Sequence, residues 1–210
     1  QRVTRSQPAR AASCRRPSTR CVDDTAGATT AGTITFVGWA RKPRIATITV
    51  MTTRLIRAGE GAILGPPSGV RDRFVIDSRD WGGRFALVEH LLAPRSIAAP
   101  MHRHSREDEF SIILEGRVWA RLGDEEVVAE VGDVVVKPRG EWHTFWNAAD
   151  EPARLLELIT PGGLEELFWT IDHTDGDFDF ATDPRILPYG CEIDMAATEP
   201  LVTQHGLTFG

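Results

Sequence analysis

The chain has 210 residues, of which 41% are hydrophobic and 26% charged, a composition typical of one folded globular domain with or without an appendage. Residues 1–50 carry a net charge of +7, whereas the remaining 160 residues carry −13. An acidic body argues against nucleic acid as a partner, and no apolar run approaches the ~20 residues of a membrane helix.

The first fifty residues differ from the rest in composition. They are rich in Arg, Ser, Thr and Ala, and the first methionine is Met51. Three interpretations stay open: a translated upstream region that is not native, a disordered tail, or an organelle transit peptide. The runs at 33–37 and 45–50 could pair as strands. Two of the three cysteines, Cys14 and Cys21, also lie here, so we expect no disulfide framework and a reducing cytoplasm.

From Arg54 onward, short β-rich runs alternate with Gly and Pro turns. Strands about ten residues apart with such turns predict an antiparallel sandwich or barrel. The predicted strands are Arg54–Arg57, Gly61–Leu64, Arg73–Ile76, Arg84–Leu92, Phe110–Glu115, Arg117–Leu122, Glu126–Glu130, Asp133–Lys137, Thr144–Asn147 and Arg154–Ile159.

The period changes after Pro161-Gly162-Gly163. Leu164, Leu167, Phe168 and Ile171 follow helical spacing, which predicts an amphipathic helix packed on the outside of the barrel. A loop and a short helix within 192–205 are expected near the end. The predicted organisation is therefore an extension over 1–50, a barrel domain over 51–175 and a C-terminal loop and helix over 176–210.

Four side chains form the most informative pattern: His102, His104, Glu109 and His143. Side chains alternate along a strand, so His102 and His104 point the same way. Glu109 has the wrong parity for the same strand, and a bend over 105–108 would reset the phase. His143 follows a Pro-Arg-Gly turn and would close the site from a neighbouring strand. Three imidazoles and a carboxylate predict a divalent transition-metal site with two open positions.

Other polar and aromatic residues near this pattern have ordinary structural explanations. Glu107 and Asp108 are interpreted as solvated bend residues, and His90, His173 and His205 as residues that do not bind metal. Trp142, Phe145 and Trp146 are interpreted as barrel core or rim. Phe145 shares the face of His143, so it is the candidate for lining a substrate pocket.

These two motifs, His-X-His-(X)4-Glu-(X)6-Gly and Gly-(X)5-Pro-X-Gly-(X)2-His-(X)3-Asn, resemble those of the cupin superfamily. Residues 85–170 look like a small bacterial single-domain cupin of the type described as similar to quercetin dioxygenase. One difference is Ser96, which stands where the first motif usually opens with Gly. The resemblance implies an all-β jelly-roll barrel, a double-stranded β-helix, to which the periodicity adds one or two short C-terminal helices. Open sheet edges, together with the resemblance, predict a homodimer.

The resemblance does not fix the reaction, because one fold hosts many functions. The leading hypothesis is a metal-dependent, quercetinase-like dioxygenase acting on a small enolisable or phenolic substrate, because a divalent ion with one carboxylate leaves a charge of +1 that favours an enolate or phenolate oxygen. The metal would be Fe, Mn, Ni or Co, with Zn as a further option, bound by His102, His104, Glu109 and His143. Glu109 would bind the metal or act as a general base, and is the candidate catalytic residue. Two alternatives stay open: a cupin that binds a small ligand without catalysis, and a metal-dependent isomerase or lyase. No nucleic-acid or membrane partner is expected.

Overall fold

The computed structural model describes residues 55–173 and 178–209, all of which belong to the second of two units in the chain, Ala46–Gly210. The predictions for residues 1–50, including both candidate strands, lie outside the described residues. Within the described ranges, no helix has the length and apolar character needed to cross a bilayer.

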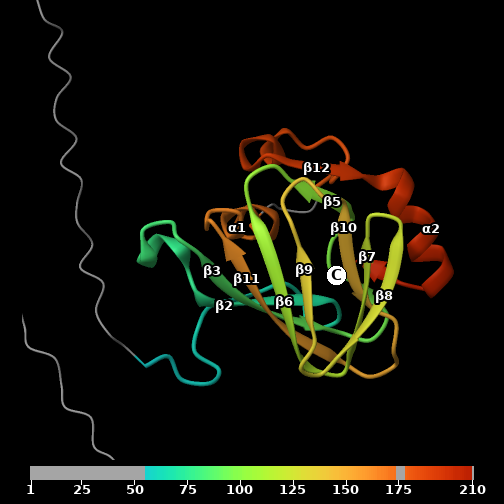
Figure 1. Cartoon of the computed structure of the whole chain (residues 1–210), viewed down its shortest axis with the longest axis horizontal. Coiled ribbons are helices and arrows are strands. Elements are labelled where there is room, and N and C mark those ends of the chain that lie inside the picture. Colours follow the sequence, from blue (N-terminus) through green and yellow to red (C-terminus); the bar gives the residue numbers. More distant parts are fainter. Residues whose placement is uncertain (1–54, 174–177, 210) are drawn as a thin grey trace, which may run out of the picture. The chain divides into compact units, whose positions relative to one another are not determined.

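Two facing sheets make up most of this unit (Figure 1). The first sheet has six strands in the order β1-β2-β3-β11-β6-β9, and its described neighbours are antiparallel. Its strands are β1 (Ile63–Leu64), β2 (Val70–Ile76), β3 (Ala86–Leu92), β11 (Ala153–Thr160), β6 (Asp108–Glu115) and β9 (Val134–Lys137).

The second sheet has seven strands and supplies the opposite wall. Its main path runs β12-β5-β10-β4-β13, and β7 pairs with both β10 and β8. The strands are β4 (Ser96–Ile97), β5 (Met101–His104), β7 (Arg117–Leu122), β8 (Glu125–Glu130), β10 (His143–Asn147), β12 (Cys191–Asp194) and β13 (Thr208–Phe209). Strands that are consecutive in sequence thus often lie in different sheets, as in a jelly-roll barrel.

Alternation along the strands forms the core. In β11, Ala153, Leu155, Glu157 and Ile159 are buried while the residues between them are partly exposed. A side chain with an inward position in this strand therefore faces the barrel interior whether it is apolar or charged. The all-β jelly-roll fold predicted from the sequence is confirmed. Most of the predicted strand segments coincide with, or overlap, an observed strand.

Four helical segments complete the unit: η1 (Ser78–Trp81), α1 (Glu165–Asp172), η2 (Pro184–Tyr189) and α2 (Met195–His205). Leu201 of α2 packs with Ile97 and Trp146 beside the second sheet, where Figure 1 shows the helix outside β7 and β8. The short C-terminal helix expected within 192–205 is therefore present.

Three sequence predictions about secondary structure need correction. Residues 55–57 form no strand, because Leu55 is 71% exposed and nothing described pairs with this run. The predicted strand Gly61–Leu64 is reduced to two residues. Helix α1 does not pack outside the barrel. Leu164 and Leu167 pack against Val88 and Ile159. These two residues lie on the inner faces of their strands, as His90 and Glu157 do. The helix therefore removes the apolar inner face of this part of the first sheet from water.

Candidate metal centre

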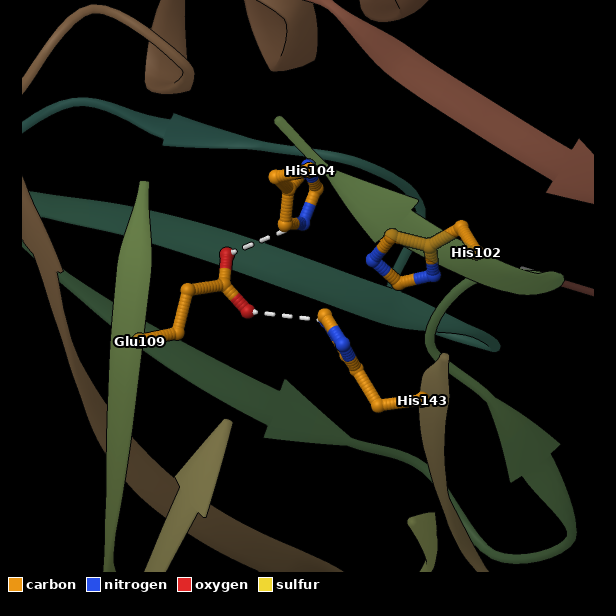
Figure 2. A group of neighbouring side chains, drawn as sticks. All are labelled: His102, His104, Glu109 and His143. Atoms are coloured by element: carbon orange, nitrogen blue, oxygen red, sulfur yellow. Dashed lines mark ion pairs between the residues drawn. The ribbon is translucent and has the colours of Figure 1, made fainter. Parts of the chain in front are cut away.

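The structure brings His102, His104, Glu109 and His143 together inside the barrel (Figure 2). One potential ligand atom from each residue lies within 4.8 Å of the others, and all four residues are buried. Strand β5 carries His102 and His104 on one face, and His143 stands directly opposite His102 in the pairing of β10 with β5. Glu109 is the second residue of β6, in the facing sheet.

Two local features of the chain bring these strands into position. Residues 105–107 form the predicted bend between β5 and β6, so Glu109 faces inward despite its parity. Gly140 lies in the turn before β10 with a φ of +83°, a conformation that disfavours side chains with a Cβ. Its N–H donates to the His104 carbonyl at 2.6 Å, which ties the turn before His143 to the end of β5.

The donor set fits a divalent transition metal. His102 and His143 donate from Nδ1 to the carbonyls of Pro100 at 2.7 Å and Glu141 at 3.0 Å, which leaves each Nε2 lone pair for the interior. The Nε2 atoms of His104 and His143 are buried without a hydrogen-bond partner among the described residues. Buried polar atoms of this kind are costly unless something satisfies them, and a metal ion would do so.

The spacing of the donors is also suitable. His143 Nε2 lies 3.2 Å from one Glu109 oxygen, and His104 Nε2 lies 3.5 Å from the other. Donors at ~2.1 Å around an octahedral ion are separated by roughly 3 Å when adjacent and 4.2 Å when opposite. The observed separations are thus close to those of a coordination sphere.

The protonation states favour metal binding. Burial lowers the pKa of His104 to about 4 and holds the pKa of His102 well below its usual value, so both rings are neutral near pH 7. Burial alone would raise the pKa of Glu109, but the Lys137 ammonium and the neighbouring imidazoles hold it well below its ordinary value. Neutral imidazoles and a carboxylate are the forms that coordinate metals.

A buried ion-pair network adjoins the four donors. Lys137 Nζ lies 3.0 Å from Glu109 and 2.8 Å from Glu157, and its side chain is 0% exposed. Glu157 also accepts from Ser111 Oγ at 3.1 Å, and Lys137 Nζ lies 4.5 Å from the centre of the Phe145 ring. Lys137 therefore fixes the orientation of Glu109 and supplies a positive charge behind the donors.

A cavity of about 340 Å³ opens onto the donors. It reaches His102, His104 and Glu109, and Phe145 lies on its wall as the alternation of β10 predicts. Most other lining residues are apolar, and the remaining ring side chains on its wall are His90, Phe168, Phe178, Phe180 and Phe209. A concave, mostly apolar site with a few polar groups is the usual form of a small-molecule site.

The remaining sequence interpretations have mixed outcomes. Trp146 is fully buried in the core, and Trp142 is partly buried beneath the Arg103 guanidinium. The interpretation of Glu107 as solvated is wrong. It is 5% exposed, because the bend folds back under the C-terminal segment, where Ser105 N–H donates to Gly190. Asp108 instead pairs with Arg139 at the surface.

Sequence reasoning missed Lys137, Glu157, His90 and Asp72. His90 lines the cavity and pairs through Nδ1 with Asp72 at 2.7 Å, although its sequence neighbours contain no second ligand. The sequence signal is the position of each residue in its strand. His90 lies on the same face as Val88 and Leu92, and Glu157 lies on the same face as Leu155 and Ile159. A charged residue at an inward position of a strand indicates either a pairing partner or a site.

Comparisons with known proteins agree with this architecture. Residues 88–159 match the Cupin_2 (cupin domain) family. Together with the two-sheet barrel, this match supports a relationship to the cupin superfamily. The barrel carries a candidate metal site of four residues.

Two curated relatives come from Streptomyces. A gentisate 1,2-dioxygenase from Streptomyces sp is 36% identical over 67 residues, which are 31% of this chain and 18% of that protein. The tetracenomycin polyketide synthase protein TcmJ of Streptomyces glaucescens is 25% identical over 93 residues, which are 44% of this chain and 62% of that protein. The chain thus spans less than two thirds of either relative.

Solved structures with similar barrels have several described activities. A sugar phosphate isomerase from a cupin superfamily, from Silicibacter pomeroyi, is 26% identical with a TM-score of 0.40, over 44% of this chain and 59% of that one. A predicted oxalate decarboxylase from Thermotoga maritima is 20% identical with a TM-score of 0.48, over 51% of this chain and 99% of that one.

Proposed function

We propose that this chain is a metal-dependent dioxygenase that acts on a small enolisable or phenolic compound. The observation that carries the proposal is the placement of three imidazoles and one carboxylate at the end of an apolar cavity of about 340 Å³. The local similarity to a gentisate 1,2-dioxygenase supports a dioxygenase over the isomerase and lyase alternatives.

The roles of the residues follow from their positions. His102, His104, Glu109 and His143 would hold Fe, Mn, Ni, Co or Zn, which when bound supplies a Lewis acid and open positions for substrate and dioxygen. One carboxylate against a divalent charge leaves the site at +1, which favours an enolate or phenolate oxygen. Glu109 would take the proton of the substrate hydroxyl, and Lys137 would keep its carboxylate aimed at the cavity.

The metal site is tested by metal analysis of protein purified without added metal. We expect about one transition-metal ion per chain, and we expect His104→Ala to lose most of it. The matched control is His173→Ala, because His173 is an exposed histidine outside the donor set. Unchanged metal content in His104→Ala would remove the basis of the proposal.

The reaction is tested by oxygen uptake with a panel of flavonols, dihydroxybenzoates and diketones. Uptake that depends on both the metal and His104 supports the dioxygenase. Turnover without oxygen consumption would replace it by an isomerase or lyase. Binding of a compound without any turnover would replace it by a non-catalytic binding cupin.

We also propose that the chain forms a homodimer through the outer face of β6 and β9. Strand β9 ends the first sheet among the described strands, and Val134 and Val136 point outward with exposed fractions of 53% and 50%. They pair with Ile112 and Phe110, which share this face. An apolar outer face beside a free strand edge is usually covered by a partner, and a second copy would cover both.

A further inference from the structure

His90 is the one histidine on the cavity wall that does not belong to the donor set, among the described residues. It lies in β3, opposite Asp72 in β2, and it is 5% exposed. Its ring packs edge-on against Phe145 at 5.4 Å and Phe168 at 6.0 Å between centroids. The ring is therefore held in a fixed position within an aromatic wall.

The hydrogen bond of His90 uses only one of its two nitrogens. Nδ1 lies 2.7 Å from Asp72 Oδ1, so it donates to that carboxylate. Nε2 lies 3.6 Å from Glu157 Oε2, which is beyond hydrogen-bonding distance. Nε2 is thus left to bond with a molecule in the cavity, and Asp72 fixes the direction in which it points.

The charges around His90 favour a donor at Nε2. Burial alone lowers the pKa of His90, but Asp72 and Glu157 outweigh burial and raise it, while Lys137 opposes them. The other side chains packed on the ring, Phe145 and Phe168, are neutral. An imidazolium donates from both nitrogens, so an oxygen atom is the complementary group.

We propose that His90, oriented by Asp72, is a second recognition group of the cavity and donates from Nε2 to an oxygen of the substrate. The substrate class is a flat, largely apolar ring compound with two oxygen substituents, one for His90 and one for the four donors. The oxygen assigned to the four donors rests on the proposed function, whereas the role of His90 does not.

The cavity supports this class of ligand. Its volume of about 340 Å³ is near the lower end of the ~300–1,000 Å³ range of ligand sites, which suits one or two rings. Phe145, Phe168 and Phe178 on its wall offer ring faces and edges to a flat molecule. Apart from the donors, the imidazole and carboxylate side chains that line the cavity are His90 with its partner Asp72, together with Glu157 and Asp172.

The test compares two shape-matched ligands, 2-naphthol and 2-methylnaphthalene, by equilibrium dialysis against the full chain after treatment with a chelator. Without metal, a preference for the hydroxyl must come from polar groups of the protein, and substitutions of His90 show whether it comes from this residue. A hydrogen bond from a charged donor is worth ~1.5–3 kcal/mol, so we expect 2-naphthol to bind roughly 10- to 150-fold more tightly.

Two substitutions separate the nitrogens of His90. In His90→Asn, the amide nitrogen replaces Nδ1 and can still donate to Asp72, but nothing replaces Nε2. We expect the preference for 2-naphthol to fall to about threefold or less. In His90→Gln, the amide lies near the position of Nε2, and we expect part of the preference to return. The matched control is His205→Asn, because His205 also pairs with a carboxylate and packs on an aromatic ring but lies outside the cavity.

Asp72 is tested as a positioning residue through pH. Asp72→Asn removes a charge that raises the pKa of His90, so binding of the acceptor-only analogue 2-methoxynaphthalene, which a neutral Nε2 cannot bond, should weaken at a lower pH than in the parent protein. A preference that is unchanged in His90→Asn, or absent from the parent protein, would overturn the inference. If the purified parent protein contains no metal or consumes no oxygen, only the proposed function is overturned, because the binding assay uses metal-free protein.

Discussion

Replacing Lys137 by Met is the sharpest test of how the barrel interior is held together. Lys137 lies within 3.0 Å of Glu109 and 2.8 Å of Glu157, and the two carboxylates are only 6% and 1% exposed. Methionine has a similar length but no charge, so the substitution leaves two buried carboxylates without their shared cation. Breaking a buried ion pair in this way typically costs ~3–5 kcal/mol.

The measurement is urea and thermal unfolding of metal-free protein, because a bound divalent ion would itself stabilise Glu109. A loss of ~3–5 kcal/mol corresponds to a fall in Tm of roughly 6–20 °C for a domain of this size. The matched control is Arg95→Met, which removes an exposed ion pair with Asp150 and should cost no more than ~1 kcal/mol.

A double-mutant cycle identifies the cause. Glu157→Gln removes one of the two carboxylates that Lys137 neutralises, so Lys137→Met with Glu157→Gln should be at least ~1 kcal/mol more stable than the sum of the single effects. If Lys137→Met costs less than ~1 kcal/mol, or if the two effects add, then the buried network does not hold the interior as the distances indicate.

Three further predictions concern catalysis, assembly and the N-terminal segment. Metal-loaded Glu109→Gln should lose at least ~100-fold in turnover on the true substrate, since an amide cannot accept the proton; near-normal turnover at full metal occupancy would exclude the base role. Light scattering at micromolar concentration should give the mass of a dimer, and Val136→Lys should shift it to that of a monomer; a monomeric parent protein would contradict the proposed interface. A shortened chain that begins at Met51 should melt within a few degrees of the full chain, and a large loss of Tm would show that the preceding residues contribute to the fold.

The sequence predicts the long strands well because they depend on local alternation. The predicted strand Arg117–Leu122 has the bounds that the structure shows, and the structure brings together the four residues that the motif spacing selects as candidate donors. Strands β4, β12 and β13 are absent from the prediction because two to four residues carry no readable period. Their positions depend on pairing with distant strands, such as that of Cys191 with His104.

Buried charges were missed for a different reason. In a single sequence, a charged residue within an alternating strand looks like an exposed one, so Lys137 and Glu157 gave no signal by residue type. Only their parity within β9 and β11 places them inside. The pairing of His90 with Asp72 depends on the register between β2 and β3, which local periodicity does not contain.

The cavity wall is built from the stretch of chain that matches the cupin domain and from the segments that flank this stretch. The four donors and Phe145 lie between β3 and β11, within the stretch that matches the cupin domain. Much of the apolar wall comes from outside this stretch, including Leu64 before it and Phe168, Phe178 and Phe209 after it. Substitutions in these flanking segments can therefore change which molecules enter the barrel while the geometry of the four donors stays intact. Related chains could then differ in substrate and still share the same metal site.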